Sequence, residues 1–146
     1  MSVFQLHPRL LEDCISLGSL SSCHVLLMDN ADVPWFILVP EPDSGMGVLE
    51  IVDLPIPEQH QVLKDVNLVS GYVKLLPGIT KLNTAALGNI VPQLHIHIVG
   101  RSPEDYCWPS LVWASEPGRR YSPSAIPDLR TDFANAMSGC FTPCNE

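Results

Sequence analysis

The sequence predicts an α+β fold, a five-stranded antiparallel β-sheet with helices packed on one of its faces. Five short apolar runs follow one another mostly without an intervening helix, which favours antiparallel pairing. One longer segment instead repeats its apolar residues at helical spacing. The chain has 146 residues, of which 46% are hydrophobic and 16% charged. This length and composition suit a single domain with a sizeable core.

The first element is expected to be a helix over residues 8–18. Leu10, Cys14 and Leu17 recur at helical spacing, and Gly18 would end the helix. The apolar runs 23–28 and 35–40, joined by a mostly polar stretch, predict a β-hairpin. The run 47–54 predicts a third strand.

The strongest helix signal covers residues 57–76, where valines fall on one stripe before a Pro-Gly break. Residues 79–87 and 93–100 predict the last two strands, joined through a Gly-Asn turn. Residues 102–146 are rich in proline and tryptophan and predict an ordered wrap, with one short helix near 128–137. The whole chain, 1–146, is therefore expected to form one domain with its core in residues 1–101.

Charge and cysteine content narrow the classes of partner. A formal net charge of -8 argues against long nucleic acids, whose binding needs many Lys and Arg contacts with phosphate. No apolar run approaches the roughly 18 residues of a membrane span, and the first residues do not resemble a signal peptide. Five scattered cysteines, an odd number, predict reduced thiols and hence a cytoplasmic protein.

The stretch PQLHIHIVGR, residues 92–101, carries two of the five histidines. Side chains alternate across a strand, so Gln93, His95 and His97 share one face, expected to be the open face of the sheet. Two such imidazoles could bind a transition metal, with His24 or His60 as further ligands. They could equally act as general acid and base, or as a nucleophile with a neighbouring proton donor. The spacing alone leaves these three chemistries open.

The run from Gln93 to Val99 resembles the signature of the histidine-triad (HIT) family, in which histidines alternate with apolar residues. The resemblance extends through most of the chain to Arg101, and it includes FILVP in the hairpin and a Trp-Pro pair at 108–109. Gln at the first triad place looks like a bacterial branch of the family. The resemblance implies a HIT-like fold, a homodimer paired through helix 57–76 and its neighbouring strand, and a nucleotide hydrolase or transferase acting at the α-phosphate. No metal and no cofactor are expected.

The resemblance also implies a role for each site residue. His95 takes the place of the nucleophile, and His97 would contact phosphate or the leaving oxygen. Gln93 can only form hydrogen bonds, so it would orient the nucleophile rather than react. The residues expected to hold the nucleotide are Asp29 at the ribose, with Asn83, Gly88 and Asn89 near the phosphate.

Three positions depart from the family pattern and define the alternatives. Gln93 replaces a histidine, Asn89 is shorter than the usual Gln, and Ile90 lacks the usual hydroxyl. The leading hypothesis is an enzyme with a covalent nucleotidyl-His95 intermediate. A non-catalytic nucleotide-binding module is the alternative, and a metal site at the two histidines comes third. Phosphoramidates, dinucleoside polyphosphates and nucleotide sugars all fit as substrates.

Several neighbouring residues have an ordinary structural explanation. Trp35 is expected in core or interface packing. Trp108 and Trp113 would pin the C-terminal wrap or close over a base. Lys81 and Arg101 flank the motif strands, either as anion contacts or as surface charges.

Overall fold

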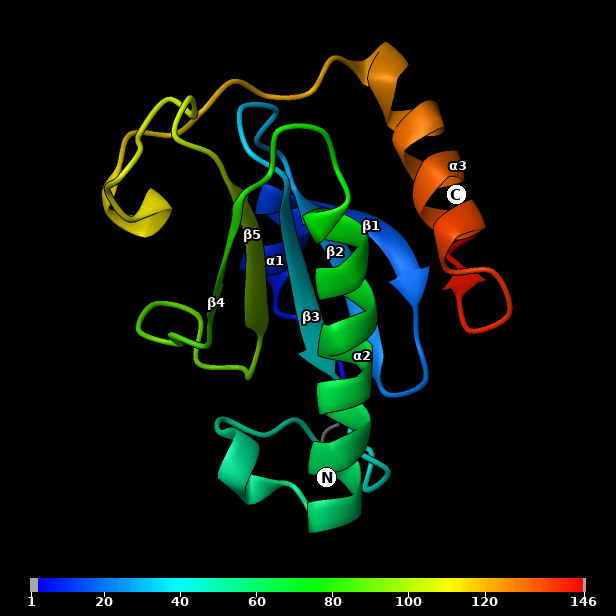
Figure 1. Cartoon of the computed structure of the whole chain (residues 1–146). Helices are drawn as coiled ribbons and strands as arrows, with labels where there is room; N and C mark the ends of the chain where they lie inside the picture. The colour runs from blue at the N-terminus through cyan, green and yellow to red at the C-terminus, as the bar shows by residue number, and fades with distance from the viewer. Residues whose placement is uncertain (1–2, 146) are drawn as a thin grey trace.

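The computed structural model describes residues 3–145, which contain a six-stranded antiparallel sheet in the order β4-β5-β3-β2-β1-β6 (Figure 1). The strands are β1 (Cys14–Ser19), β2 (Cys23–Met28), β3 (Trp35–Pro40), β4 (Lys81–Ala85), β5 (Ile96–Arg101) and β6 (Thr142–Pro143). The α+β class is confirmed, and the predicted number of five strands is wrong.

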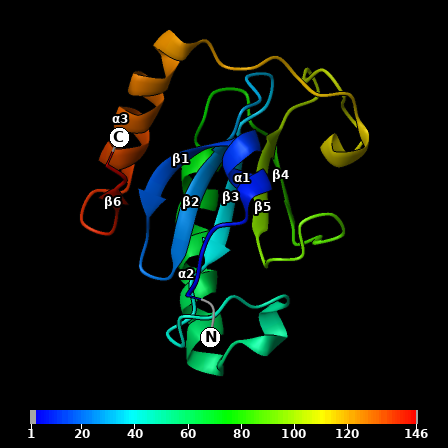
Figure 2. The same cartoon turned by 180° about the vertical axis from the view of Figure 1, so that it is seen from behind.

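Helices lie on both faces of the sheet, not on one. The helices are α1 (Pro8–Asp13), α2 (Ile56–Lys74) and α3 (Ile126–Ala136), with 3₁₀ turns at Ile51–Asp53, Val112–Ala114 and Pro123–Ala125. Helices α2 and α3 bury Val69 and Phe133 in one core with the side chains of one sheet face. Helix α1 lies on the opposite face, as the reverse view shows (Figure 2). There it buries Leu10 in a second core. The sequence expectation missed this second layer.

The predicted helix 8–18 ends at Asp13, and its second half is strand β1. The spacing of Leu10 and Leu17 fits a helix, but Ile15 and Leu17 also share one strand face, and both pack in the α2 core. Gly18 does not end a helix; a side chain there would lie 2.1 Å from the Thr142 carbonyl oxygen, where β6 pairs with β1. The apolar residues fit the helical repeat and the strand repeat equally well. Pairing with β2 and β6 therefore decides that this segment is a strand.

The predicted strand at 47–54 is absent from the described sheet. The segment instead forms a 3₁₀ turn in which the Glu50 N–H donates to the Asp53 carboxylate and the Asp53 N–H to the Glu50 carbonyl, both at 3.1 Å. Local bonds of this kind compete with a β-ladder. Val52 is exposed, so the apolar run does not enter the core.

The remaining elements agree with the sequence patterns. The β2–β3 hairpin, the long helix α2, strands β4 and β5 and the short helix α3 all occur within a few residues of their expected bounds. No helix in residues 3–145 is long and apolar enough to cross a membrane. The division into a core and a C-terminal wrap stays a prediction.

Candidate functional site

Two adjoining cavities lie on the α1 face of the sheet. The first, here called the His95 pocket, has a volume of about 330 Å³. The second, the Asp29 pocket, has about 420 Å³. Both are lined by Asp13, Met28, His97 and Trp113, so they form two chambers of one site.

His95 is 6% exposed and precedes β5 at the floor of the His95 pocket. Its Nδ1 lies 2.7 Å from the main-chain carbonyl oxygen of Gln93. A carbonyl can only accept, so Nδ1 must carry the proton. In the neutral ring Nε2 is then left with a free lone pair, which is the state of a nucleophile.

His97 holds the opposite tautomer. Its Nδ1 lies 3.0 Å from the indole Nε1 of Trp35, and an indole N–H can only donate. The proton of the neutral ring therefore sits on Nε2. Burial, together with the neighbouring His95 ring, lowers the pKa of His97 to about 4. The centroids of the His95 and His97 rings lie 4.9 Å apart, so the two imidazoles are direct neighbours.

Two tryptophans that the sequence placed in packing roles enclose His97. The ring centroids of Trp35 and Trp113 lie 5.8 and 5.4 Å from that of His97. The alternation of β3 could have identified Trp35, because its pairing with β5 sets Ile37 opposite His97 on the same face. No local signal identifies Trp113, which arrives from the long segment after β5.

The Gln93 side chain is directed to the N-terminal segment. Its Oε1 accepts from the His7 N–H at 2.9 Å, and its Nε2 donates to the Gln5 carbonyl at 2.8 Å. The main-chain carbonyl of Gln93, not its amide, is what contacts the His95 ring. Gln93 lines neither of the two chambers.

The expected nucleotide contacts fall into two groups. Asp29 lines the Asp29 pocket, where its carboxylate accepts from the Tyr121 N–H at 2.9 Å. Gly88, with a positive φ of 72°, and Asn89 line the His95 pocket. Asn83 lines neither chamber, because its Oδ1 accepts from Arg101 at 2.9 Å.

Arg101 is a buried structural cation. Its Nε donates to Asp105 at 2.7 Å, and its side chain is 1% exposed. The Asp105 hydrogen bond raises the pKa of Arg101 further. The Arg101 guanidinium carbon lies over the Trp108 ring, 5.5 Å from its centroid, and Trp108 lines neither chamber. Lys81 donates to the Leu82 carbonyl on the edge strand.

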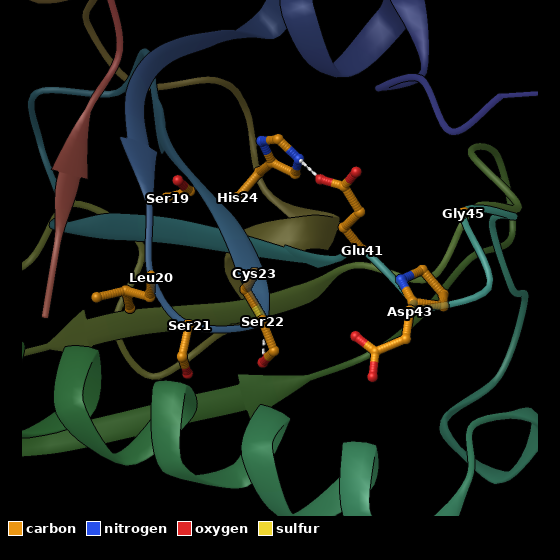
Figure 3. A pocket seen from close by; sticks show the side chains of 10 residues that line it. Ser19, Leu20, Ser21, Ser22, Cys23, His24, Glu41, Asp43 and Gly45 are labelled. Carbon is orange, nitrogen blue, oxygen red and sulfur yellow. Dashed lines mark hydrogen bonds and ion pairs between the residues drawn. The ribbon is translucent and has the colours of Figure 1, made fainter.

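The other proposed metal ligands do not join the histidine pair. His24 lies in a separate pocket, where its Nε2 is 2.5 Å from a Glu41 carboxylate oxygen (Figure 3). His60 lines neither chamber. Within residues 3–145 no group of three His, Cys, Asp or Glu side chains is placed to hold a metal ion.

Helix α1 supplies a wall of the site that the sequence did not indicate. Arg9 and Leu10 line the His95 pocket, and Asp13 lines both chambers. Arg9 and Asp13 lie 3.7 Å apart, and both side chains are more than half exposed. Their place at the site depends on where α1 packs, which the pattern of the helix itself does not specify.

Comparisons with known proteins identify relatives of this chain. Residues 12–104 match the model of the HIT domain. A histidine triad protein from Bradyrhizobium japonicum is 34% identical, with a TM-score of 0.86 over 94% of this chain and 100% of that chain. One from Marinobacter aquaeolei is 38% identical, with a TM-score of 0.85 over 92% and 96%. One from Sinorhizobium meliloti is 32% identical, with a TM-score of 0.84 over 91% and 96%.

None of the curated proteins compared with the chain matches it. The family model nevertheless covers strands β1 to β5, helix α2 and both histidines of the motif strand. Membership of this family supports nucleotide binding, hydrolysis or transfer as the general kind of activity. The chain belongs to the histidine-triad (HIT) family.

Proposed function

We propose that the protein is a nucleotide hydrolase or nucleotidyltransferase that acts at the α-phosphorus through a covalent intermediate on His95. The observation that carries this proposal is the hydrogen bond from His95 Nδ1 to the Gln93 carbonyl. This bond places the single N–H proton of the neutral ring on Nδ1. The Nε2 lone pair is then free at the floor of the His95 pocket.

The reaction has two steps. In the first, Nε2 forms a bond to the α-phosphorus while the bond from phosphorus to the leaving group breaks, and the leaving group takes the electron pair. In the second, water adds its oxygen to phosphorus and loses a proton to solvent, and the P–N bond breaks. The pair returns to Nε2, which leaves as a neutral imidazole because Nδ1 keeps its proton. A second hydroxyl or phosphate in place of water would give transfer.

The other residues bind and orient in this proposal. Gly88 and Asn89 hold the phosphate, and Asp29 the ribose. Gln93 takes the first triad place, as in the bacterial branch described above, and contributes its carbonyl to the nucleophile while its amide fastens the N-terminal segment. Asn83 does not contact the nucleotide in this proposal and supports the site indirectly, through its hydrogen bond with Arg101.

Trapping the intermediate tests the mechanism. The protein is mixed with α-³²P-labelled nucleotides and quenched in denaturant at alkaline pH, because a phosphorus–nitrogen bond is labile in acid. Label is expected on the peptide that contains His95 in the wild type and none in His95→Ala. The variant should still bind nucleotide, since the nucleophile contributes little to ground-state binding. Substantial turnover by His95→Ala would refute the proposal.

A non-catalytic nucleotide-binding module is the second candidate. It is favoured by one observation, the buried hydrogen bond from Trp35 to His97 Nδ1, which holds that ring neutral. Neither a neutral imidazole nor Gln93 is an effective acid toward a leaving group at neutral pH. A wild-type protein that binds AMP but forms no labelled His95 with any nucleotide tested would establish this alternative.

The homodimer also belongs to the proposal. Leu63 and Leu68 are exposed on α2, as is Leu75 directly after it, and β4 is an edge strand with an unpaired side in the described sheet. Pairing through these elements would cover both features. Light scattering at micromolar concentration should give twice the 16.0 kDa mass of the chain; a 16.0 kDa particle would contradict it. The cytoplasmic location remains an expectation from the cysteines.

A further inference from the structure

Trp35 makes the hydrogen bond that defines the state of His97. The two side chains are 8% and 6% exposed, and the indole Nε1 lies 3.0 Å from the imidazole Nδ1. Because an indole N–H never accepts, His97 can keep this bond only while Nδ1 is unprotonated. Either protonation of Nδ1 or rotation of the ring by half a turn would leave a buried indole N–H without its acceptor.

The sheet register and a second indole hold this pair in place. Strand β3 sets Trp35 opposite Val99 and Ile37 opposite His97, so Trp35 is the diagonal neighbour of His97 on the pocket face. Trp113 packs edge-on against both Trp35 and His97, at 6.0 and 5.4 Å between ring centroids. The Trp113 Nε1 is buried and has no hydrogen-bond partner among residues 3–145. One of the two indoles therefore bonds to His97, and the other only packs against it.

The charged groups around His97 have opposing effects on its protonation. The ionisable side chains that share its two chambers are His95, Arg9, Asp13, Asp29, Tyr106 and Arg120. The two carboxylates favour an imidazolium, whereas burial, His95 and the arginines oppose it. None of these groups forms a hydrogen bond or ion pair with the His97 ring in the described chain. Trp35 is its one hydrogen-bond partner there.

We propose that Trp35 is a positioning residue that locks His97 as a neutral Nε2–H donor, so that the site favours nucleotides whose leaving group departs without taking up a proton. This inference rests on the covalent mechanism proposed above. When the bond from the α-phosphorus to the leaving oxygen breaks, the electron pair stays on that oxygen. The resulting anion accepts a hydrogen bond from Nε2–H, and no proton is transferred.

The substrate class follows from that chemistry. Phosphates and carboxylates are stable anions, so phosphoric anhydrides and acyl phosphates of a nucleotide meet the requirement. The amine of a phosphoramidate and the alkoxide of an alkyl ester must be protonated as they leave. A missing general acid costs such substrates about 10²–10⁴-fold in rate.

Imidazole ¹⁵N NMR tests the lock without reference to activity. Wild-type His97 is expected to show an acceptor Nδ1 and a protonated Nε2 throughout pH 6 to 8. Trp35→Phe keeps an aromatic ring but removes the donor, so the Nδ1–H tautomer should appear and the pKa of His97 should rise by about one unit. Trp113→Phe is the matched control, because it removes an indole N–H that bonds to nothing in the described chain.

A wild-type spectrum with a protonated Nδ1 overturns the lock, as do identical His97 signals in Trp35→Phe and Trp113→Phe. If Trp35→Phe does not fold, the wild-type spectrum decides by itself.

Paired substrates test the preference. The kcat/KM of the wild type is measured for an AMP phosphoric anhydride and for an AMP phosphoramidate with an alkylamine leaving group. The anhydride should be preferred by at least about 100-fold, the lower bound for a missing general acid. Equal rates overturn the preference. If neither substrate reacts while the NMR result holds, the covalent function and the preference fail together, but the lock between Trp35 and His97 stands.

Discussion

Replacing Gln93 with alanine separates the two bonds that this residue makes with different parts of the molecule. The substitution removes the side-chain amide, which holds His7 N–H at 2.9 Å and the Gln5 carbonyl at 2.8 Å. It keeps the main-chain carbonyl that orients His95. We therefore expect a clear loss of stability and a small loss of turnover.

The size of the stability loss follows from the two hydrogen bonds. Each contributes about 0.5–1.5 kcal/mol, and the Gln5 carbonyl is exposed enough to bond to water instead, so the total is about 1–2 kcal/mol. For a chain of this length that lowers Tm by about 2–8 °C. Turnover should stay within about tenfold of the wild type, a barrier change of about 1.4 kcal/mol, whereas His95→Ala should have none.

Three measurements check this prediction: thermal unfolding, hydrogen exchange at the His7 amide and steady-state turnover. Gln59→Ala is the control, because its side chain makes one hydrogen bond, to the Leu54 carbonyl at 2.8 Å, outside both chambers. It should lose stability without faster exchange at His7. The reasoning is refuted if Gln93→Ala abolishes turnover as completely as His95→Ala while Tm and exchange remain at wild-type values.

Three further predictions concern pH, charge and packing. The pKa of His97 is lowered in the folded chain to about 4. As the pH falls below the ordinary pKa of histidine, His97 is therefore protonated in the unfolded chain but not in the folded one. Stability should therefore drop by about 3 kcal/mol between pH 6.5 and 4, and urea titrations of His97→Asn should show a smaller drop. Arg101→Met leaves a buried carboxylate without its cation and should cost about 3 kcal/mol in chemical unfolding; an unchanged midpoint would contradict the structural role given to this ion pair. Gly118→Ala places a Cβ 2.3 Å from a buried amide oxygen and should cost about 1–3 kcal/mol, whereas Gly71→Ala, in open space on α2, should stabilise by about 0.5–1 kcal/mol; calorimetry that ranks them the other way refutes the packing argument.

The parts of the fold that local patterns determine were predictable. The valine stripe of α2 and the alternation of β5 each have one period, and both elements formed as expected. The residues of β1 satisfy two periods at once, and the choice between them is made by pairing with β2 and with β6, a strand of two residues from the far end of the chain. Such a choice depends on tertiary contacts that no window of sequence contains.

The candidate site divides in the same way. His95 and His97 lie adjacent because the motif itself places them so. The partners of polar side chains depend on what packs nearby: Asn83, expected at the nucleotide, bonds to Arg101, and the Gln93 side chain, expected to orient the nucleophile, bonds to the N-terminal segment. Trp113 reaches His97 through the path of a long segment that carries no periodic signal.

The walls of the two chambers have a consequence for how this protein could be altered. The match to the HIT domain covers residues 12–104, which contain both histidines, Gly88 and Asp29. Arg9 and Leu10 precede that stretch, and the Trp113 side of the site follows it. The reactive groups thus lie within the matched stretch, whereas part of the enclosing wall comes from residues on either side of it. Grafting residues 105–121 of a relative onto this domain should replace the Trp113 wall, while Trp35, His97 and the nucleophile stay in place.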